Sequence, residues 1–312
     1  MTKARPQYPI ERSPLYNLRR KAKLAQLLGA SVQELRFLYP DTRYSDFQQA
    51  KKDGTLRDVS VPDERLKQIQ KRLLRLLQRI ETSDWLISGK RKKSYVDNAR
   101  FHIKANEVVT IDIRKFYDNC RHKHIYSTYL NTFKASPDVA YLLCQITTRS
   151  WGLPTGAPTS QLVAFWSYHQ AFNQIDAIAQ KFGCVFSLYV DDMTFSSQHA
   201  IPVPELLHDV SAILCNVGHR IKYSKIEHYV AGSAKLITGT VLDKEKNLRV
   251  PNRLRHKIMT DLDRLKSCKL SVVEKDKLSN TLIGRVLAAR NIEPGIFPEV
   301  MKLAKANLSS NS

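Results

Sequence analysis

The amino-acid sequence predicts an α+β fold, with strands in the middle of the chain and helices before and after them. Two observations support this class. Most β-branched and apolar runs of strand length lie between residues 108 and 242, whereas apolar residues recur at helical spacing on either side of that region. Hydrophobic residues make up 43% of the 312 residues, which is enough to bury a large core and excludes a wholly disordered chain.

The N-terminal part of the chain predicts helices followed by two extended segments. We expect one or two short helices within residues 15–38, the second of them capped by Ser31. The dipeptide Asp53-Gly54 predicts a turn between two short extended segments, which end at Val59 and Val61.

A long basic helix is predicted to begin at residues 62–64, because apolar residues then recur at helical spacing as far as Ile80. The opposite face carries six cations, namely Arg65, Lys67, Lys71, Arg72, Arg75 and Arg79. A solvated face normally mixes both charges, so we interpret this face as the wall of a basic groove. A loop with four further cations follows at Lys90–Lys93.

Strands and helices are predicted to alternate through the rest of the chain. Residues 108–113 form a β-branched strand with Asp112 near its end. Two short apolar runs flank residues 190–192, which predicts a β-hairpin. Helical patterns cover residues 122–134, 137–149, 159–182 and 204–217, with an irregular loop at 152–158, short strands near Ile221, Tyr229 and 236–242, and basic helices from Pro251 to Leu308.

The net charge indicates the class of partner. Fifty Lys and Arg residues against 29 Asp and Glu residues leave +21, with an isoelectric point near 9.8. A chain that repels itself this strongly usually binds a polyanion, and nucleic acid is the most common one. A protein that is merely basic is the alternative.

The cysteines and the apolar runs bear on the compartment. The five cysteines are scattered with no close pair, which argues against a zinc site or a disulfide framework and fits a reducing cytoplasm. No run of about 18 apolar residues is present, as a membrane-spanning helix would need. The basic N-terminal segment also lacks the apolar stretch of a signal peptide. We therefore expect a cytoplasmic protein without membrane association.

Three aspartates are the candidates for chemistry. Asp191 and Asp192 are adjacent between two apolar runs, where an exposed turn would be the ordinary explanation. If the strand that carries Asp112 lies beside this hairpin, however, the three carboxylates meet at one sheet edge. Such a cluster suits Mg²⁺, and two ions about 3.5–4 Å apart can activate a hydroxyl and stabilise a leaving phosphate oxygen. With a basic groove, this arrangement points to phosphoryl transfer on nucleic acid.

These residues resemble the motifs of reverse transcriptases in order and in spacing. Tyr189–Asp192 resembles the YxDD box, Asp112–Tyr117 the first metal-binding motif, and Gly152–Ser160 the LPQGAPTS loop. The resemblance implies a right-hand polymerase with fingers, an antiparallel-sheet palm and a short helical thumb. The implied domains are residues 1–105 for N-terminal helices and fingers, 106–248 for the palm with interleaved fingers helices at about 120–150, and 249–312 for the thumb.

Two further segments are similar to signatures of retron reverse transcriptases. Asn98–His102 fits NAxxH, although Asn98 could also simply cap a helix, and Ile237–Gly239 is close to VTG. This resemblance implies that the enzyme copies part of a structured non-coding RNA into branched multicopy single-stranded DNA from an internal 2′-hydroxyl group. It further implies an antiphage defence system with a separate effector protein.

Two alternatives remain open on the sequence. Another bacterial reverse transcriptase is one, of the diversity-generating type or of the intron type, although an intron enzyme usually carries further RNA-binding and endonuclease segments. A non-catalytic RNA-binding scaffold on the same fold is the other.

The resemblance also implies residue roles. Asp112, Asp191 and Asp192 would be catalytic and would hold two Mg²⁺ ions, with the Ile113 carbonyl as an extra ligand. The nucleotide would be contacted by Arg57 at the triphosphate, Tyr117 as a sugar gate, Thr155 and Gly156 in the loop, and Lys225 near the pyrophosphate. The cognate RNA and its RNA–DNA product would be held by Asn98, Ala99, His102, Ile237, Thr238, Gly239, Arg253 and Arg255. For Arg57 and Lys225, simple solvation is an equally good explanation.

The nucleotide loop departs from the family pattern at two positions. Thr155 stands where glutamine is usual, and Gln161 stands where proline is common. Because threonine is too short to span the same distance, we expect the nucleotide contact at this position to be lost or mediated by water.

Overall fold

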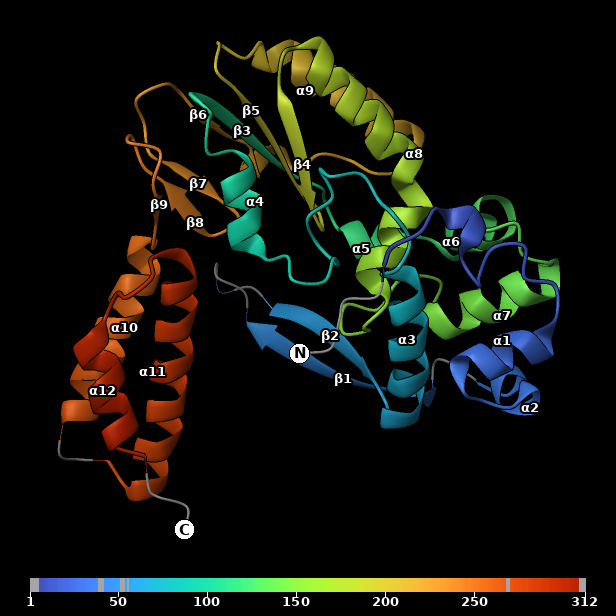
Figure 1. Cartoon of the computed structure of the whole chain (residues 1–312), viewed down its shortest axis with the longest axis horizontal. Helices are drawn as coiled ribbons and strands as arrows, with labels where there is room; N and C mark the ends of the chain where they lie inside the picture. The colour runs from blue at the N-terminus through green and yellow to red at the C-terminus, as the bar shows by residue number, and fades with distance from the viewer. Residues whose placement is uncertain (1–5, 39–41, 51–53, 55, 268–269, 309–312) are drawn as a thin grey trace.

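The computed structural model describes residues 6–38, 42–50, 54, 56–267 and 270–308. Within these residues the chain forms an α+β fold with three antiparallel sheets (Figure 1). The predicted fold class is therefore confirmed. Asp53, in the turn predicted at residues 53–54, lies outside the described residues.

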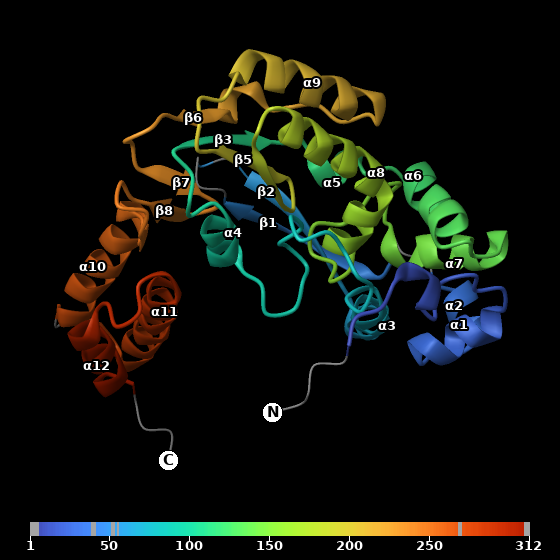
Figure 2. The same cartoon turned by 45° about the horizontal axis from the view of Figure 1, so that its top comes forward.

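The central sheet has four strands in the order β4-β5-β3-β6. These are β3 (Glu107–Asp112), β4 (Val185–Tyr189), β5 (Asp192–Ser197) and β6 (Glu227–Tyr229). Strand β5 pairs with both β4 and β3, so the strand that carries Asp112 does lie beside the predicted hairpin. Helices α8 (Ser160–Lys181) and α9 (Val203–Asn216) cover one face, and α4 (Tyr95–Phe101) lies on the other (Figure 2).

The finger hairpin, formed by β1 (Tyr44–Ala50) and β2 (Leu56–Pro62), is antiparallel and largely exposed. Helix α3 (Glu64–Leu77) follows it directly, and the Asp63 carboxylate caps that helix by accepting a hydrogen bond from the Leu66 N–H at 2.7 Å. Four more helices lie in the segments predicted to form the fingers: α1 (Lys21–Leu28), α2 (Val32–Arg36), α6 (His122–Ser127) and α7 (Pro137–Thr147). The helix predicted at 122–134 is interrupted, because a π-helical turn replaces its second half at Thr128–Thr132.

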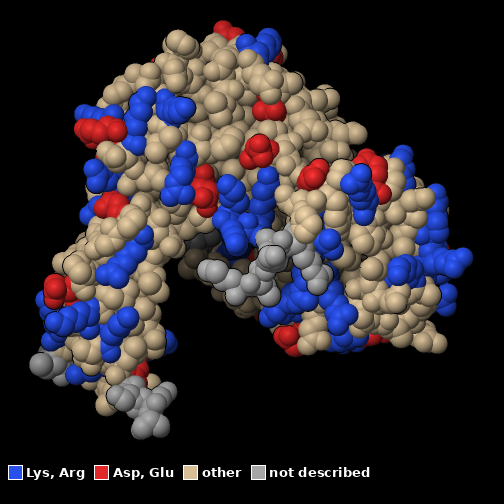
Figure 3. Space-filling model, viewed as in Figure 1, with Lys and Arg blue, Asp and Glu red and all other residues tan. Residues whose placement is uncertain are grey.

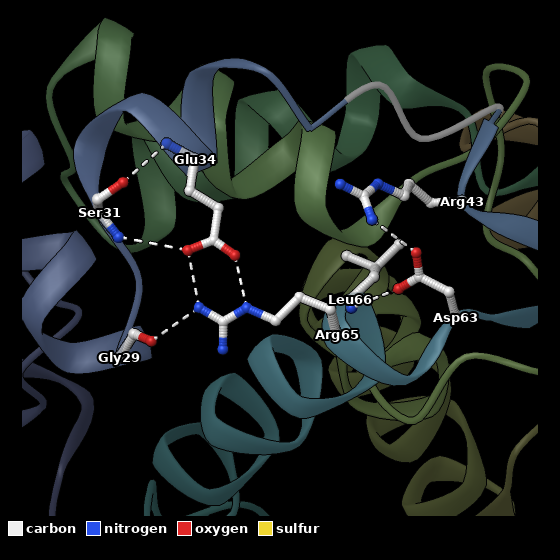
Figure 4. Close-up of polar contacts among 7 residues, drawn as sticks. All are labelled: Gly29, Ser31, Glu34, Arg43, Asp63, Arg65 and Leu66. Atoms are coloured by element: carbon white, nitrogen blue, oxygen red, sulfur yellow. Dashed lines mark hydrogen bonds and ion pairs between the residues drawn. The ribbon is translucent and has the colours of Figure 1, made fainter.

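Part of the predicted basic groove wall on α3 is turned toward the N-terminal helices instead (Figure 4). The Arg65 guanidinium binds both carboxylate oxygens of Glu34 and donates to the Gly29 carbonyl at 3.0 Å. Glu34 also forms a capping box with Ser31, as expected for that cap. Arg79 lies 4.7 Å from the centre of the Tyr8 ring. The wall is therefore smaller than the sequence suggests, because α2 supplies a carboxylate to α3.

The helices after Pro251 gather around a second apolar core, to which Val96 of α4 also contributes. These helices are α10 (Asn252–Lys266), α11 (Val272–Ile292) and α12 (Pro298–Ala306). A small sheet of β7 (Lys235–Ile237), β8 (Thr240–Leu242) and β9 (Leu248–Arg249) leads into them. The surface is hollowed between the thumb and the rest of the molecule, with Lys and Arg side chains on both sides of the hollow (Figure 3).

The fingers and the palm share one continuous core, which runs from Leu15 to Ile221. The boundary predicted near residue 105 therefore does not coincide with a break in this core. In the part of the chain that the structure describes, no helix is long and apolar enough to cross a membrane.

Candidate active site

The turn between β4 and β5 carries two of the aspartates. Tyr189 pairs with Asp192 across the hairpin, which leaves Val190 and Asp191 at its tip. Val190 has a φ of 63°, a left-handed conformation that is costly for a β-branched residue. Its N–H donates to the Ser88 hydroxyl at 2.8 Å, and this contact helps to hold the strained turn in place.

Asp112 lies at the same end of the sheet. It faces Asp192 in the β3–β5 register, and the next residue, Ile113, donates its N–H to the Asp191 carbonyl at 3.0 Å. Burial, reinforced by the charges of Asp192 and Asp112, raises the pKa of Asp191 to about 7. The structure thus gathers three carboxylates at one sheet edge, where their negative charges are crowded.

The crowded charge is partly balanced by Lys225, whose Nζ lies 2.7 Å from Asp112 Oδ2. With the side chains as they stand, no group of three or more His, Cys, Asp or Glu among the described residues is arranged to hold a metal ion. The chemistry of the donors nevertheless fits Mg²⁺, since the three carboxylates are hard oxygen ligands with excess negative charge.

The predicted sugar gate lies beside these carboxylates. Tyr117 is half-buried in the short helix α5 (Phe116–Asn119). Burial and the nearby charge of Asp191 raise the pKa of its hydroxyl, while the charge of Arg57 opposes that rise. Tyr117 therefore lies within electrostatic reach of both Asp191 and Arg57, although these two residues belong to different parts of the molecule.

The nucleotide loop, residues 152–158, packs directly on strand β2. Gly156 donates its N–H to the Ser60 carbonyl at 3.1 Å. The Thr155 hydroxyl donates to the Asp58 carbonyl at 3.0 Å. This bond ties the loop to the strand that carries Arg57, and it agrees with the expectation that Thr155 makes no direct contact with the nucleotide.

The NAxxH segment is buried, which corrects the expectation of direct RNA contact. Asn98 and Ala99 have no exposed surface, and His102 is 1% exposed. Asn98 accepts from the Ser187 hydroxyl at 2.7 Å and donates to the Thr238 hydroxyl at 3.2 Å. Because both polar groups of the Asn98 amide are already hydrogen-bonded inside the protein, Asn98 does not bind RNA itself. It links the palm hairpin, formed by β4 and β5, to the β7–β8 turn.

His102 completes this internal network. Its ring nitrogens lie 2.7 Å from the hydroxyls of Ser187 and Ser196, on the two strands of the palm hairpin. Since Ser187 donates its proton to Asn98, the Nε2 atom of His102 must be the donor to Ser187. Burial lowers the pKa of His102 to about 3, so the imidazole is neutral at ordinary pH.

This neutral imidazole predicts an acid-sensitive fold. Below pH 6.5 the unfolded chain binds a proton at His102, whereas the folded protein does not until about pH 3. Stability is therefore lost as the pH falls through this window, by about 2 kcal/mol between pH 7 and pH 5. Urea unfolding measures the free energy of unfolding at pH 7 and at pH 5. Its decrease between these pH values should be smaller in His102→Gln than in the unmodified protein, by this amount. An equal drop in both proteins would contradict the prediction.

The VTG-like segment and the thumb arginines are only partly available for RNA. Ile237 is fully buried, and the Thr238 hydroxyl donates to the Tyr95 carbonyl at 3.2 Å. Gly239, half-exposed with a φ of 87°, stays a candidate contact at the β7–β8 turn. Arg255 makes two hydrogen bonds of 2.8 Å to Glu293, so part of its guanidinium is already engaged within the thumb.

Arg253, at the start of α10, is exposed and stays a candidate RNA contact.

Two further residues near the candidate active site, Ser88 and Arg149, were not predicted from the sequence. Each acts through a partner about a hundred positions away, Val190 and Asp46 respectively. No local pattern marks such contacts.

Known proteins resemble this chain in sequence and in fold. Residues 49–265 match the family model of reverse transcriptase (RNA-dependent DNA polymerase). The retron Ec86 reverse transcriptase of Escherichia coli is 27% identical over 221 residues, which cover 69% of each chain. The retron Se72 reverse transcriptase of Salmonella heidelberg is 26% identical over 230 residues, 69% of this chain and 60% of the relative.

A third relative aligns with this chain over more residues than these two. The retron Ec83 reverse transcriptase of Escherichia coli is 24% identical over 277 residues, 84% of this chain and 87% of the relative. A solved structure of telomerase from Candida albicans, in complex with a fragment of telomeric RNA, matches at a TM-score of 0.50 and 10% identity over 85% of this chain and 63% of that one. This last likeness concerns the fold alone.

The family model covers well over half of the chain, and it contains all three aspartates, the nucleotide loop and the finger strand β2. The chain therefore belongs to the reverse transcriptases, the RNA-directed DNA polymerases, and among them it is a retron reverse transcriptase.

Proposed function

We propose that this polymerase copies part of a cognate structured RNA into branched multicopy single-stranded DNA, with deoxynucleotides as substrates and two Mg²⁺ ions per active site. The observation that carries the proposal is the meeting of Asp112, Asp191 and Asp192 at one sheet edge. Bound there, the ions would activate the attacking hydroxyl and stabilise the leaving phosphate oxygen.

The surrounding side chains have complementary roles in this proposal. Arg57 would bind the triphosphate oxygens, because a guanidinium can pair with two of them at once. Lys225 holds an ammonium group beside Asp112, where it would neutralise and protonate the departing pyrophosphate. The thumb and the basic loop at 90–93 would hold the RNA–DNA duplex through phosphate contacts, which carry little sequence information.

The biological setting belongs to the same proposal. We infer a cytoplasmic role in antiphage defence, together with a separate effector protein, because the relatives are retron enzymes. The described cysteines fit a reducing compartment, since Cys120, Cys144, Cys184 and Cys215 are all free thiols.

The branched product gives the most direct test. Purified protein is incubated with its structured RNA, deoxynucleotides and Mg²⁺, and the DNA is then treated with ribonuclease. We expect a DNA that keeps a short RNA remnant at its 5′ end, from which a debranching enzyme releases it. Synthesis only from added primers with a free 3′-hydroxyl would contradict internal priming, and no synthesis at all would favour the RNA-binding scaffold.

The proposed sugar gate is tested by Tyr117→Ala. Removing the ring opens space for a ribose 2′-hydroxyl, so we expect discrimination against ribonucleotides to fall by at least about tenfold. Tyr117→Phe keeps the flat ring and should retain normal selection. Incorporation of ATP and dATP is compared in single-nucleotide extension. A Tyr117→Ala enzyme that is active and equally selective would remove the gate from the proposal.

A further inference from the structure

We propose that Arg149 is a positioning residue that clamps the finger hairpin against the nucleotide loop and thereby sets the place of Arg57 in the nucleotide pocket. This inference deepens the proposed function, because it rests on Arg57 as the contact to the triphosphate. Arg149 lies two residues after the end of α7 and three residues before the nucleotide loop begins at Gly152.

The clamp is a hydrogen-bonded cluster that joins Arg149 to both strands of the hairpin. Its guanidinium binds both carboxylate oxygens of Asp46 on β1, with Nη2 at 2.8 Å from Oδ2. Nη1 also donates to the Ser60 hydroxyl on β2 at 2.9 Å, and Ser60 in turn donates to Asp46 at 2.7 Å. The guanidinium carbon lies 5.1 Å from the centre of the Tyr44 ring. Only arginine offers a planar fork that satisfies these partners together.

The nucleotide loop holds the same strand from its backbone. Gly156 donates to the Ser60 carbonyl, and the Thr155 hydroxyl donates to the Asp58 carbonyl. Ser60 is therefore held at two points. Its hydroxyl accepts a hydrogen bond from Arg149, and its carbonyl accepts one from the loop. Arg57 precedes Asp58 directly, so its backbone position follows from these contacts.

The chain geometry around Arg149 is strained in a way that the clamp explains. Arg149 and Gly152 exchange two backbone hydrogen bonds of 2.9 Å across a two-residue turn. Its central residues, Ser150 and Trp151, have φ values of 46° and 70°, where asparagine and glycine are the usual choice. Trp151 is also 78% exposed. This turn is unfavourable because of its two positive φ values and its exposed tryptophan. Its presence is explained if the turn directs the Arg149 side chain toward the hairpin.

The cluster should act on the pocket rather than on global stability. The Asp46 side chain is 58% exposed and that of Arg149 is 17% exposed, and an ion pair with one partner in solvent contributes only modestly to the free energy of unfolding. Hydrogen bonds from Arg149 and Ser60 lower the pKa of Asp46 to about 2, so the clamp stays charged throughout the pH range of an assay. The position of Arg57 is the property that the clamp can change.

The first test is Arg149→Lys, which keeps the charge but loses the fork. We expect the KM for deoxynucleotides to rise about three- to tenfold, with kcat changed less than about twofold and the melting temperature unchanged. The control is Arg65→Lys, the same substitution in a comparable bidentate pair that faces α2 (Figure 4); its KM should stay normal. The reversed pair Asp46→Arg with Arg149→Asp should recover part of the loss. A normal KM in Arg149→Lys would overturn the proposal.

A second comparison separates this proposal from the role of Arg57. Arg57→Gln should raise the KM by itself, and Arg149→Lys should add little in that background, because both act on one contact. If the two substitutions raise the KM additively, the clamp proposal is overturned, while Arg57 remains a nucleotide contact. An unchanged KM in Arg57→Gln would instead remove Arg57 from the proposed function.

Hydrogen exchange provides a readout that does not depend on activity. In Arg149→Lys we expect faster exchange of the backbone amides of β2, since the hairpin is released from one of its two ties. Exchange in α11 serves as the internal reference. Unchanged protection of β2 would show that the loop alone holds the hairpin, and would contradict the clamp.

Discussion

Replacing Asp191 with asparagine is expected to reduce DNA synthesis by at least about a thousandfold while leaving the fold and RNA binding intact. Asparagine keeps the size of the side chain but removes the charge that a divalent cation needs. The basic surfaces that would hold RNA lie elsewhere, on the thumb and in the loop at residues 90–93. Activity and binding should therefore respond differently to this one change.

The charge distribution around Asp191 adds a prediction about stability. Its carboxylate is crowded by Asp192 and Asp112, which, together with burial, disfavours the ionised form in the folded protein. A neutral amide relieves this repulsion, so the melting temperature without added metal should be no lower than that of the unmodified protein. A marked drop would show that the carboxylate has a structural role, and would contradict this account.

The measurements are primer extension with Mg²⁺, RNA affinity by filter binding, and thermal unfolding. Asp209→Asn is a suitable control, because it removes the same charge from an ion pair with Lys181 on the surface of α9. It should leave synthesis unchanged. Equal losses of synthesis and RNA binding in Asp191→Asn would argue against the division between catalytic and binding surfaces.

Gly156→Ala is expected to reduce synthesis by about a hundredfold, because a methyl group would force the nucleotide loop away from the finger hairpin. A Cβ atom at this position would lie 2.4 Å from the Ser60 carbonyl oxygen. That oxygen belongs to a strand backbone, and Ser60 is fixed on its other side by its pairing with Asp46. Neither partner can move aside easily, so the loop and β2 must separate.

Gly284→Ala provides the matched control for this substitution. Gly284 lies inside helix α11, and a Cβ atom there would meet no atom within 4 Å. Alanine should therefore stabilise that helix by up to about 1 kcal/mol and leave synthesis unchanged. Steady-state kinetics and urea unfolding of both variants test the comparison. Normal activity in Gly156→Ala would show that the loop does not need its close contact with Ser60.

The sequence predicted the parts of the site that depend on neighbours along the chain. The apolar runs on both sides of residues 190–192 formed the hairpin, and the β-branched strand placed Asp112 beside it. Ser31 capped its helix as expected, and helices formed after Pro251 as predicted. Periodicity and capping act over a few residues, so they can be recognised without a structure.

Side-chain partners were harder to predict, as His102 and Arg255 show. The sequence marked both as RNA contacts, yet one is enclosed by two serines of the palm hairpin and the other binds Glu293. A polar residue in a recognisable motif can serve the fold as well as a ligand. Which of the two it does depends on whether another segment supplies a partner.

From the sequence alone came the α+β fold, the three aspartates at one sheet edge and the kinship with retron reverse transcriptases. Only the tertiary structure decided that Thr155 binds the finger strand, that Arg65 faces α2 and that Arg149 meets Asp46. The physical reason is that local patterns fix how each segment folds, whereas the hydrogen bonds of these side chains join segments that are 31 to 103 positions apart.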